Sequence, residues 1–355
     1  MKKTYVSVLL ASGLCLALTA RAAEPEYTFR MTTFTTEGSE MWERIIEPIG
    51  ERIKLATDGR VEIKAYPIGV LAGVFEGHKA VVDGRADLAH HYAAFEVNEH
   101  PANAFVGAIP GGMGPYAAFN WLVQGGGIEL WQEFKHDVQG THPLLCGMSG
   151  TEVFMHSHRR VQTLADIKGL RYRTAGAAAD VLKALGAAPT VVPLPEIFTL
   201  LERQAIDAAE YGSPTQNFDL GFHKVAKYII VPGIHAPSAV YGLIMKTETW
   251  ESLPEDIQQK FEVVCDSVTA TSLTKAESRD VSIMKEWKTG KNEIVTIDEE
   301  LASAVREEGR RWARQKAEEL KNKGDDWMER MADSYYEFQD TWANNSGYRV
   351  IDAAR

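Results

Sequence analysis

The sequence predicts an α/β fold of two lobes, with a cleft between them and long helices at the C-terminal end. Strand, helix and strand patterns alternate over residues 27–92, and a second alternating unit covers residues 144–235. From Ser267 to the end the apolar pattern is almost entirely helical. A chain of 355 residues is long for a single core, so two lobes are the expected arrangement.

The first 22 residues have the pattern of a secretory signal that is removed after export. Lys2 and Lys3 precede an apolar run over residues 5–18, and residues 20–22 (Ala-Arg-Ala) supply the small residues that a signal peptidase recognises. The apolar run is too short to span a bilayer comfortably. We therefore predict a signal peptide over residues 1–22 and a mature protein in the periplasm, with no later membrane span.

The N-terminal unit is expected to begin with a strand at Tyr27, where apolar and polar residues alternate. The next helix is predicted between Ser39, a candidate N-cap, and Gly59, a candidate stop. Pro48 lies inside this helix and predicts a kink, because proline has no N–H to donate. A strand over residues 60–69 and a helix that leads into a further strand complete the unit.

Residues 107–127 are rich in Gly and Pro but lack the ordered Gly-x-Gly-x-x-Gly of a nucleotide-binding loop. We interpret these glycines as positions where the backbone bends tightly around a ligand or a hinge. The second unit is expected to contain helices at 177–186 and 195–204, and strands near 152–157, 169–173, 190–193 and 205–211.

Strand patterns return after residue 235, so the chain is predicted to cross between the lobes more than once. We assign residues 23–147 plus about 236–270 to lobe I. Residues 148–235 plus about 271–355 are assigned to lobe II and the C-terminal helices. Such a topology creates a cleft between the lobes, where small-molecule sites prefer to lie.

The formal charge is −11, and it becomes −14 when Lys2, Lys3 and Arg21 leave with the signal peptide. An acidic surface argues against nucleic acid and anionic lipid as partners, and an anionic ligand would need cations close to its site. Cys146 and Cys265 remain after processing. Either they pair in an oxidising compartment, or they are two buried small apolar residues.

Several segments, taken in order, resemble the periplasmic solute-binding proteins of tripartite ATP-independent periplasmic (TRAP) transporters. These segments are RVEIKAYPIGVLAGVFEGHKAVVDGRADLAH (60–90), IKGLRYRTAG (167–176) and LGAAPTVVPLPEIFTLLERQAIDAAE (185–210). The resemblance extends from about Tyr27 to Tyr335 and implies a two-lobed fold of the periplasmic-binding-protein type II-like class. The most similar subgroup binds 2-oxo acids and related hydroxy acids, often with a metal ion, and residues 125–131 and 223–228 carry its features.

The resemblance also implies the residues of a ligand site. Arg173 matches the arginine that binds the solute carboxylate, because a guanidinium presents two parallel N–H donors that a lysine cannot copy. Glu210 and Tyr211 match a metal-ligating carboxylate and its aromatic neighbour. Glu152 falls where the subgroup often has Gln, and Ala236 where it often has a second metal-ligating Glu. Alanine offers no side-chain oxygen to a Na or Ca ion, so Glu152 either replaces that ligand or receives an ammonium or hydroxyl group of the solute.

Other residues near these motifs have two interpretations each. Tyr92 and Phe95 follow a strand end, and they either line the solute pocket or belong to the core. Arg171 lies on the same side of its strand as Arg173, but we prefer a structural role because the family permits Lys there. Trp121 and Trp131 are predicted to be core residues.

No pattern of an enzyme is found. The pairs His90-His91 and His156-x-His158 lack the i, i+4 spacing and adjacent Glu that are typical of hydrolytic zinc sites. The sequence has no Gly-x-Ser-x-Gly elbow, and no cysteine lies in a recognisable nucleophile motif. We therefore predict a binding protein and not an enzyme.

The predicted function is that of an extracytoplasmic receptor, which binds a small organic carboxylate of the 2-oxo or hydroxy acid class and delivers it to a TRAP membrane permease. Solute that bridges both lobes would stabilise the closed arrangement. The alternatives are an aromatic, sugar or amino-group-bearing acid, or a receptor that feeds a sensor kinase. Five C-terminal aromatic residues either support a homodimer, as in the resembled subgroup, or pack against the lobes of their own chain. They are Trp327, Tyr335, Tyr336, Phe338 and Trp342.

Overall fold

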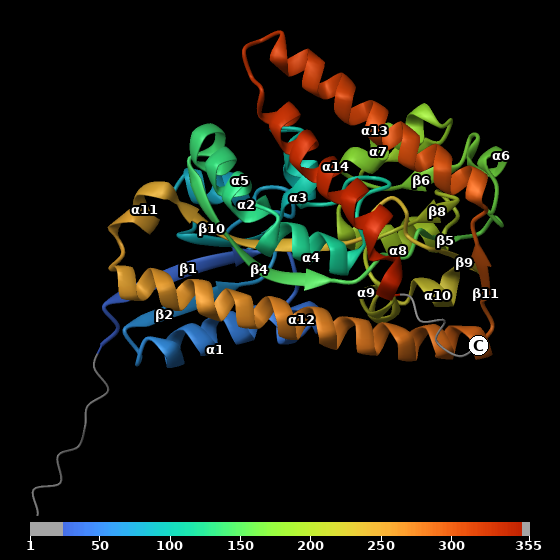
Figure 1. Ribbon diagram of the computed structural model, residues 1–355. Coiled ribbons are helices and arrows are strands. Elements are labelled where there is room, and N and C mark those ends of the chain that lie inside the picture. The colour runs from blue at the N-terminus through green and yellow to red at the C-terminus, as the bar shows by residue number, and fades with distance from the viewer. Residues whose placement is uncertain (1–23, 350–355) are drawn as a thin grey trace, which may run out of the picture.

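The structure, a computed structural model, describes residues 24–349 and contains two β-sheets that lie side by side with helices around them (Figure 1). This arrangement confirms the predicted α/β class. The predicted signal peptide lies outside the described residues. Within residues 24–349, none of the helices has the length and apolar character needed to cross a membrane.

The first sheet contains five strands and combines both strand directions. β1 pairs in parallel with β2 and β3, whereas β10 is antiparallel to β3 and β4. The strand that the sequence did not predict is β4, which is buried along its whole length and therefore shows no alternation of polar and apolar residues. The order across the sheet is β2 (Val61–Tyr66), β1 (Tyr27–Thr33), β3 (Leu88–Tyr92), β10 (Ala239–Lys246) and β4 (Thr141–Ser149).

The second sheet has six short strands. Three of them, β5, β6 and β8, lie where strands were predicted near 152–157, 169–173 and 205–211, whereas the strand predicted near 190–193 ends at residue 190. The edge strand β11 interrupts the C-terminal region that was predicted as almost wholly helical. The order is β11 (Glu293–Thr296), β9 (Tyr228–Val231), β5 (Met155–Ser157), β8 (Ala208–Ala209), β6 (Arg171–Arg173) and β7 (Ala188–Thr190).

The chain passes from the first sheet to the second between β4 and β5, and it returns between β9 and β10. The two crossing segments touch, because the backbone N–H of Glu152 donates to the carbonyl of Ala236 at 3.2 Å. Residues from both crossings therefore lie between the sheets.

The shorter helices cover the faces of the sheets. The predicted distortion at Pro48 takes the form of a π-helical turn, Trp42–Ile46, directly before α1. The helix bounds are α1 (Glu47–Ala56), α2 (Gly77–Val82), α3 (Asn103–Val106), α4 (Pro115–Gln124), α5 (Gly127–Phe134), α6 (Leu164–Ile167), α7 (Ala177–Ala184), α8 (Leu194–Glu202), α9 (Pro214–Asp219), α10 (Phe222–Val225) and α11 (Thr247–Ser252).

Three long helices, α12 (Glu255–Thr289), α13 (Glu299–Lys321) and α14 (Trp327–Asn345), connect the two halves of the molecule. α12 packs against β4 and α1 at one end and against α9 and β11 at the other, as Figure 1 shows. α13 lies on α7, and α14 returns to α3, α4 and α5. The C-terminal aromatic residues pack against this core, as in the Tyr335–Trp121 ring contact, so they cover part of their own chain.

The glycines of residues 107–127 permit close contacts within the protein. A Cβ on Gly107 would lie 2.2 Å from the backbone nitrogen of Ala94, and one on Gly112 would lie 2.4 Å from the Tyr335 hydroxyl. Gly107 thus lets the backbone at Ala94 come close, and Gly112 lets Tyr335 of α14 come close. The sequence analysis had instead interpreted these glycines as a bend around a ligand or a hinge. The contact at Gly107 also fixes Ala94, which faces the cavity described below.

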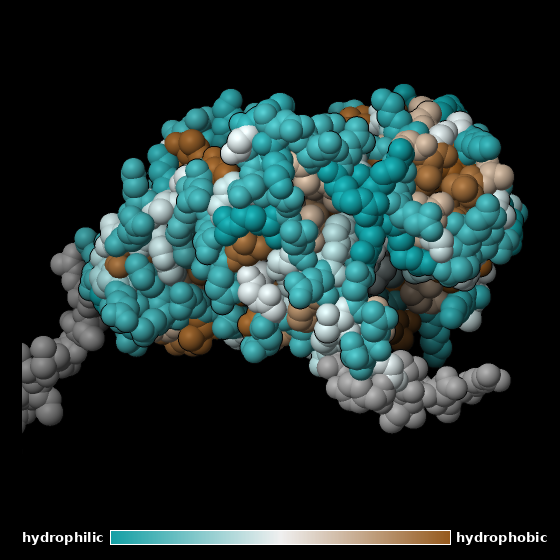
Figure 2. Space-filling model, turned by 45° about the horizontal axis from the view of Figure 1, so that its top comes forward, coloured by the Kyte–Doolittle hydropathy of each residue, from teal (hydrophilic) through white to brown (hydrophobic). Residues whose placement is uncertain are grey.

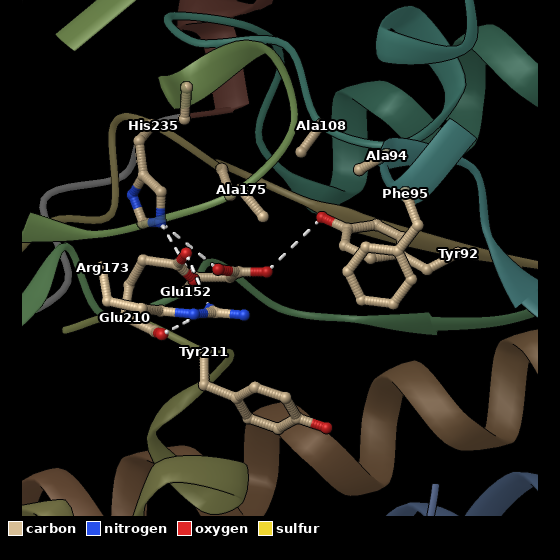
Figure 3. A pocket seen from close by; sticks show the side chains of 12 residues that line it. Tyr92, Ala94, Phe95, Ala108, Glu152, Arg173, Ala175, Glu210, Tyr211 and His235 are labelled. Atoms are coloured by element: carbon tan, nitrogen blue, oxygen red, sulfur yellow. Dashed lines mark hydrogen bonds and ion pairs between the residues drawn. The ribbon is translucent and has the colours of Figure 1, made fainter. Parts of the chain in front are cut away.

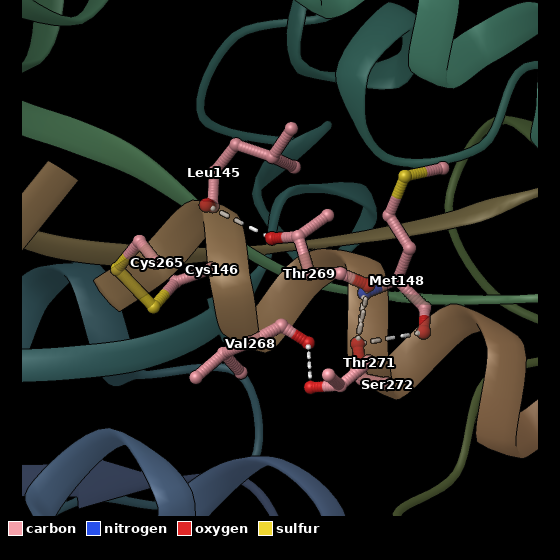
Figure 4. Close-up of a disulfide and its surroundings, with 8 residues drawn as sticks. All are labelled: Leu145, Cys146, Met148, Cys265, Val268, Thr269, Thr271 and Ser272. Atoms are coloured by element: carbon pink, nitrogen blue, oxygen red, sulfur yellow. Dashed lines mark hydrogen bonds between the residues drawn. A yellow bond between two sulfur atoms is a disulfide. The ribbon is translucent and has the colours of Figure 1, made fainter. Parts of the chain in front are cut away.

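Cys146 of β4 and Cys265 of α12 form a disulfide, which resolves the two interpretations of these cysteines (Figure 4). Hydrogen bonds continue the attachment of the helix to the strand. The Thr269 hydroxyl donates to the carbonyl of Leu145 at 3.0 Å, and the N–H of Met148 donates to the Ser272 hydroxyl at 3.1 Å. The long helix is thereby fixed to the centre of the molecule.

The surface is mostly hydrophilic on the face that Figure 2 shows, with small separate apolar areas. This agrees with the acidic composition of the chain.

Candidate functional site

A cavity lies between the two sheets, next to the crossing segments (Figure 3). Its empty space is about 420 Å³, including the opening to solvent. Tyr92 ends β3, Arg173 ends β6 and Glu210 directly follows β8, so three strand ends meet here. Glu152 and His235 come from the two crossing segments. The lining residues are Tyr92, Ala94, Phe95, Ala108, Glu152, Arg173, Ala175, Ala178, Glu210, Tyr211, His235 and Ala236.

Every site residue predicted from the sequence lies in this lining. These residues are Arg173, Glu152, Glu210, Tyr211, Tyr92 and Phe95. Arg171 instead lies on the surface, where it forms an ion pair with Asp207, as its predicted structural role requires. Trp121 and Trp131 are buried in the core, as predicted.

Arg173 is buried and is held by oxygens of the protein. Its Nη1 donates to the carbonyl of Glu210 at 2.9 Å and to Oε1 of the same residue at 3.1 Å. Its Nε and Nη2 both donate to the carbonyl of Val192, at 3.2 and 3.0 Å. A guanidinium has five N–H donors, so the described residues leave one donor of Nη2 free. In this arrangement Arg173 offers a carboxylate one N–H, whereas the sequence suggested two parallel donors.

His235 is the functional candidate that the sequence analysis missed. Its Nε2 lies 3.3 Å from Oε2 of Glu152 and 3.8 Å from Oε2 of Glu210. Among the described residues, neither ring nitrogen has a partner with good hydrogen-bond geometry, so these contacts are ion pairs. The sequence did contain a signal for this residue. A carboxylate was expected at position 236, which is alanine, and the residue directly before it, His235, is ionisable.

The loop that carries His235 fits closely against the other crossing segment. A Cβ on Gly233 would lie 2.0 Å from the carbonyl oxygen of Glu152, so only glycine allows the two backbones to approach this closely. The ring of His235 also packs against the ring of Phe154 at 5.5 Å between centroids. These contacts hold the imidazole between the two glutamates.

The charges in the cluster alter one another. Burial, together with the charge of Glu210, raises the pKa of Glu152 to about 7, although His235 opposes this change. Burial alone would lower the pKa of His235, but the two glutamates raise it to about 9. Burial opposes ionisation of Glu210, but Arg173 and His235 outweigh it and lower its pKa. At neutral pH two cations therefore face one full and one partial negative charge, and the cluster carries a small net positive charge.

The rest of the cavity is apolar or aromatic. Five alanines contribute only methyl groups, and Phe95 and Tyr211 contribute ring surfaces. The hydroxyl of Tyr92 donates to Oε1 of Glu152 at 3.5 Å, which places the tyrosine at the border between the polar and apolar sides. The cavity thus has one charged end and one apolar wall.

The predicted metal ligand, Glu210, is engaged by groups of the protein. Arg173 binds its Oε1, and its Oε2 faces His235. The carboxylates of Glu152 and Glu210 and the imidazole of His235 offer ligand atoms within 4.8 Å of one another. Ca²⁺ prefers six to eight oxygen ligands, and a set of two carboxylates and one nitrogen does not fit that preference.

A family model described as "Bacterial extracellular solute-binding protein, family 7" (DctP) matches residues 31–319. A monocarboxylate 2-oxoacid-binding periplasmic protein of Nostoc is 25% identical over 308 residues, which is 85% of this chain and 82% of the relative.

Solved structures show the same fold. A TRAP-transporter solute-binding protein of Bordetella bronchiseptica, a dimer with calcium and picolinate, has a TM-score of 0.83 and 25% identity, over 90% of this chain and 94% of that one. A TRAP protein of Pseudoalteromonas atlantica with sodium and pyruvate has a TM-score of 0.83 and 22% identity, over 91% of this chain and 96% of that one. The predicted two-lobed fold and the absence of an enzymatic role are confirmed by this similarity. The chain belongs to the bacterial extracellular solute-binding protein family 7, the DctP family of TRAP-transporter receptors.

Proposed function

We propose that this protein is a periplasmic TRAP receptor that binds a small monocarboxylate of the 2-oxo or 2-hydroxy acid class around Arg173 and delivers it to the membrane permease. The observation that carries the proposal is a buried guanidinium with one free donor, at the charged end of a cavity with an otherwise apolar wall. An anion at this end would receive a charge-assisted hydrogen bond.

The balance of charge favours a solute with a single negative charge. Arg173 and His235 carry two positive charges, Glu210 carries one negative charge, and Glu152 is partly protonated at neutral pH, so the cluster can balance at most one further negative charge. A second carboxylate would leave an unpaired buried charge, which costs several kcal/mol by an order-of-magnitude estimate.

The apolar wall favours a solute whose other end is small and apolar. Ala94, Ala108, Ala175 and Ala178 offer no side-chain donor or acceptor, so the hydroxyl groups of a sugar acid would lose their water without replacement. The 2-oxo or 2-hydroxyl oxygen, next to the carboxylate, would lie near the polar groups of Glu152 and Tyr92. This polarity pattern matches the substrate class named for the relative from Nostoc.

A thermal-shift screen followed by isothermal titration calorimetry tests the proposal. The panel contains pyruvate, 2-oxoisovalerate, lactate, picolinate and L-gulonate, with pyruvamide as the uncharged analogue of pyruvate. A 2-oxo acid at about a hundred times its dissociation constant should stabilise the folded protein by about 3 kcal/mol, whereas pyruvamide should not. Stabilisation by pyruvamide equal to that by pyruvate, or no response to any monocarboxylate, would refute the proposal.

Delivery to a permease needs a separate measurement. Uptake of the identified acid into vesicles that contain the TRAP membrane subunits should require this protein. Uptake that proceeds equally without it would contradict the transport role.

A further inference from the structure

The two buried glutamates share one cationic neighbour from the protein, the side chain of His235. His235 is 2% exposed, and its Nε2 faces Oε2 of both Glu152 and Glu210. Two carboxylates this close repel each other unless a positive group lies between them. The imidazole occupies the position in which such a group is required.

Each oxygen of the two carboxylates already lies close to a hydroxyl or cationic group of the protein. In Glu152, Oε1 accepts from the Tyr92 hydroxyl, and Oε2 faces His235. In Glu210, Oε1 accepts from Arg173, and Oε2 faces His235. A cation that entered here would have to displace the imidazole or the guanidinium from its partners.

The remaining wall offers little to a hard cation. Ala236, next to His235, has no side-chain oxygen, and neither have Ala175 and Ala178 in the same lining. Na⁺ and Ca²⁺ prefer several oxygen ligands, and nitrogen is a poor substitute. The residues present therefore do not fit the ions that accompany the acids in the Bordetella and Pseudoalteromonas proteins.

We propose that His235 takes the place of a bound metal ion in this receptor, so that acid binding is independent of calcium and sodium. The inference rests on the proposed function. His235 is here a positioning residue: its imidazole faces one oxygen of each glutamate, and through Glu210 it supports the orientation of Arg173. The same contacts make the site specific for a solute that arrives without an ion.

The first test uses metal alone and does not depend on the identity of the solute. Ca²⁺, Na⁺ or Zn²⁺ is titrated into the chelator-treated full-length mature protein, with potassium as the only other cation, and thermal unfolding is measured. We expect no shift with any of the three ions. A saturable shift with Ca²⁺ or Na⁺, or a Zn²⁺ shift that His235→Ala abolishes, would overturn the inference.

The second test measures binding of pyruvate and 2-oxoisovalerate by calorimetry in chelator, in Ca²⁺ and in Na⁺. The wild-type dissociation constant should agree within about twofold in the three conditions. His235→Gln should weaken binding at least tenfold in chelator, since it removes a partner of two buried charges. His158→Gln is the matched control, because Nε2 of His158 donates to the Leu201 carbonyl at 2.7 Å outside the cavity, and this variant should bind like the wild type.

The outcomes separate the two proposals. Wild-type binding that is lost in chelator and restored by Ca²⁺ would overturn the role of His235 and leave the receptor function intact. If neither acid binds under any condition, the proposed function fails for these acids, and the titration with metal alone still decides the inference. If His235→Gln does not fold, that titration and the wild-type comparison remain decisive.

Discussion

Replacement of Arg173 by methionine tests the central residue of the cavity. Methionine is shorter but keeps the apolar contacts of the aliphatic part of the side chain, and it removes the charge and all N–H donors. Four hydrogen bonds are lost: two to Glu210 and two to the Val192 carbonyl. The side chains of the pair are 4% and 7% exposed, so water cannot replace the lost partner of Glu210.

The expected magnitude follows from this burial. A buried ion pair that loses one partner typically destabilises a protein by about 3–5 kcal/mol. Since His235 still faces Glu210, we expect the lower end, about 3 kcal/mol, or a fall in melting temperature of about 4 °C. Binding of a 2-oxo acid should weaken by about 2–5 kcal/mol, which corresponds to tens- to thousands-fold in the dissociation constant.

Calorimetry with pyruvate and thermal unfolding of the solute-free protein measure both effects. Arg171→Met is the matched control, because Arg171 lies on the same strand and pairs with Asp207, but its side chain is 52% exposed. It should change stability by no more than about 1 kcal/mol and should not change affinity. The double variant Arg173→Met with Glu210→Gln should be more stable than the sum of the single effects predicts. Wild-type affinity in Arg173→Met would refute the assignment of Arg173 to the site.

Three further predictions concern the cavity and its support. Burial raises the pKa of Glu152 to about 7, so its protonated form favours the folded state below pH 4.5, and this contribution is lost as the pH rises through 7. Glu152→Gln should therefore gain stability relative to the wild type by roughly 2 kcal/mol between pH 5 and pH 8 in denaturant titrations, and a pH-independent difference would contradict this. Replacement of Cys146 and Cys265 by serine should cost about 2–5 kcal/mol in the same assay, because the disulfide closes a loop over a sequence separation of 119; an unchanged midpoint would show that it adds no stability. Gly107→Ala should destabilise by about 1–3 kcal/mol and weaken solute binding, because the added Cβ displaces Ala94; unchanged values for both would disprove this steric account.

The sequence predicted the broad architecture because its signals are local. Polar and apolar residues alternate over residues 27–33, and apolar residues recur every four positions after Ser39. Such patterns indicate which face of a strand or helix is buried, regardless of which element packs against it. Where a strand is buried on both faces, as β4 is, the alternation disappears and the sequence analysis did not find the strand. The π-helical turn before Pro48 was predictable as a distortion, because proline cannot donate a hydrogen bond wherever it lies.

The residues of the cavity were partly predictable for a related reason. Arg173, Glu210 and Tyr211 lie in segments with recognisable motifs, and each is located at the end of a short strand. Strand ends that belong to one sheet meet at its edge, so the motifs also implied that these residues lie near one another.

The sequence by itself determined the fold class, the family and the polar residues of the cavity other than His235. Only the tertiary structure decided how these residues pair: His235 lies between Glu152 and Glu210, and Arg173 keeps one donor free. The physical reason is that these pairings join segments distant in sequence, and they depend on how closely the two crossing segments approach. That approach is set by contacts such as Gly233 against the Glu152 carbonyl, which no local periodicity records.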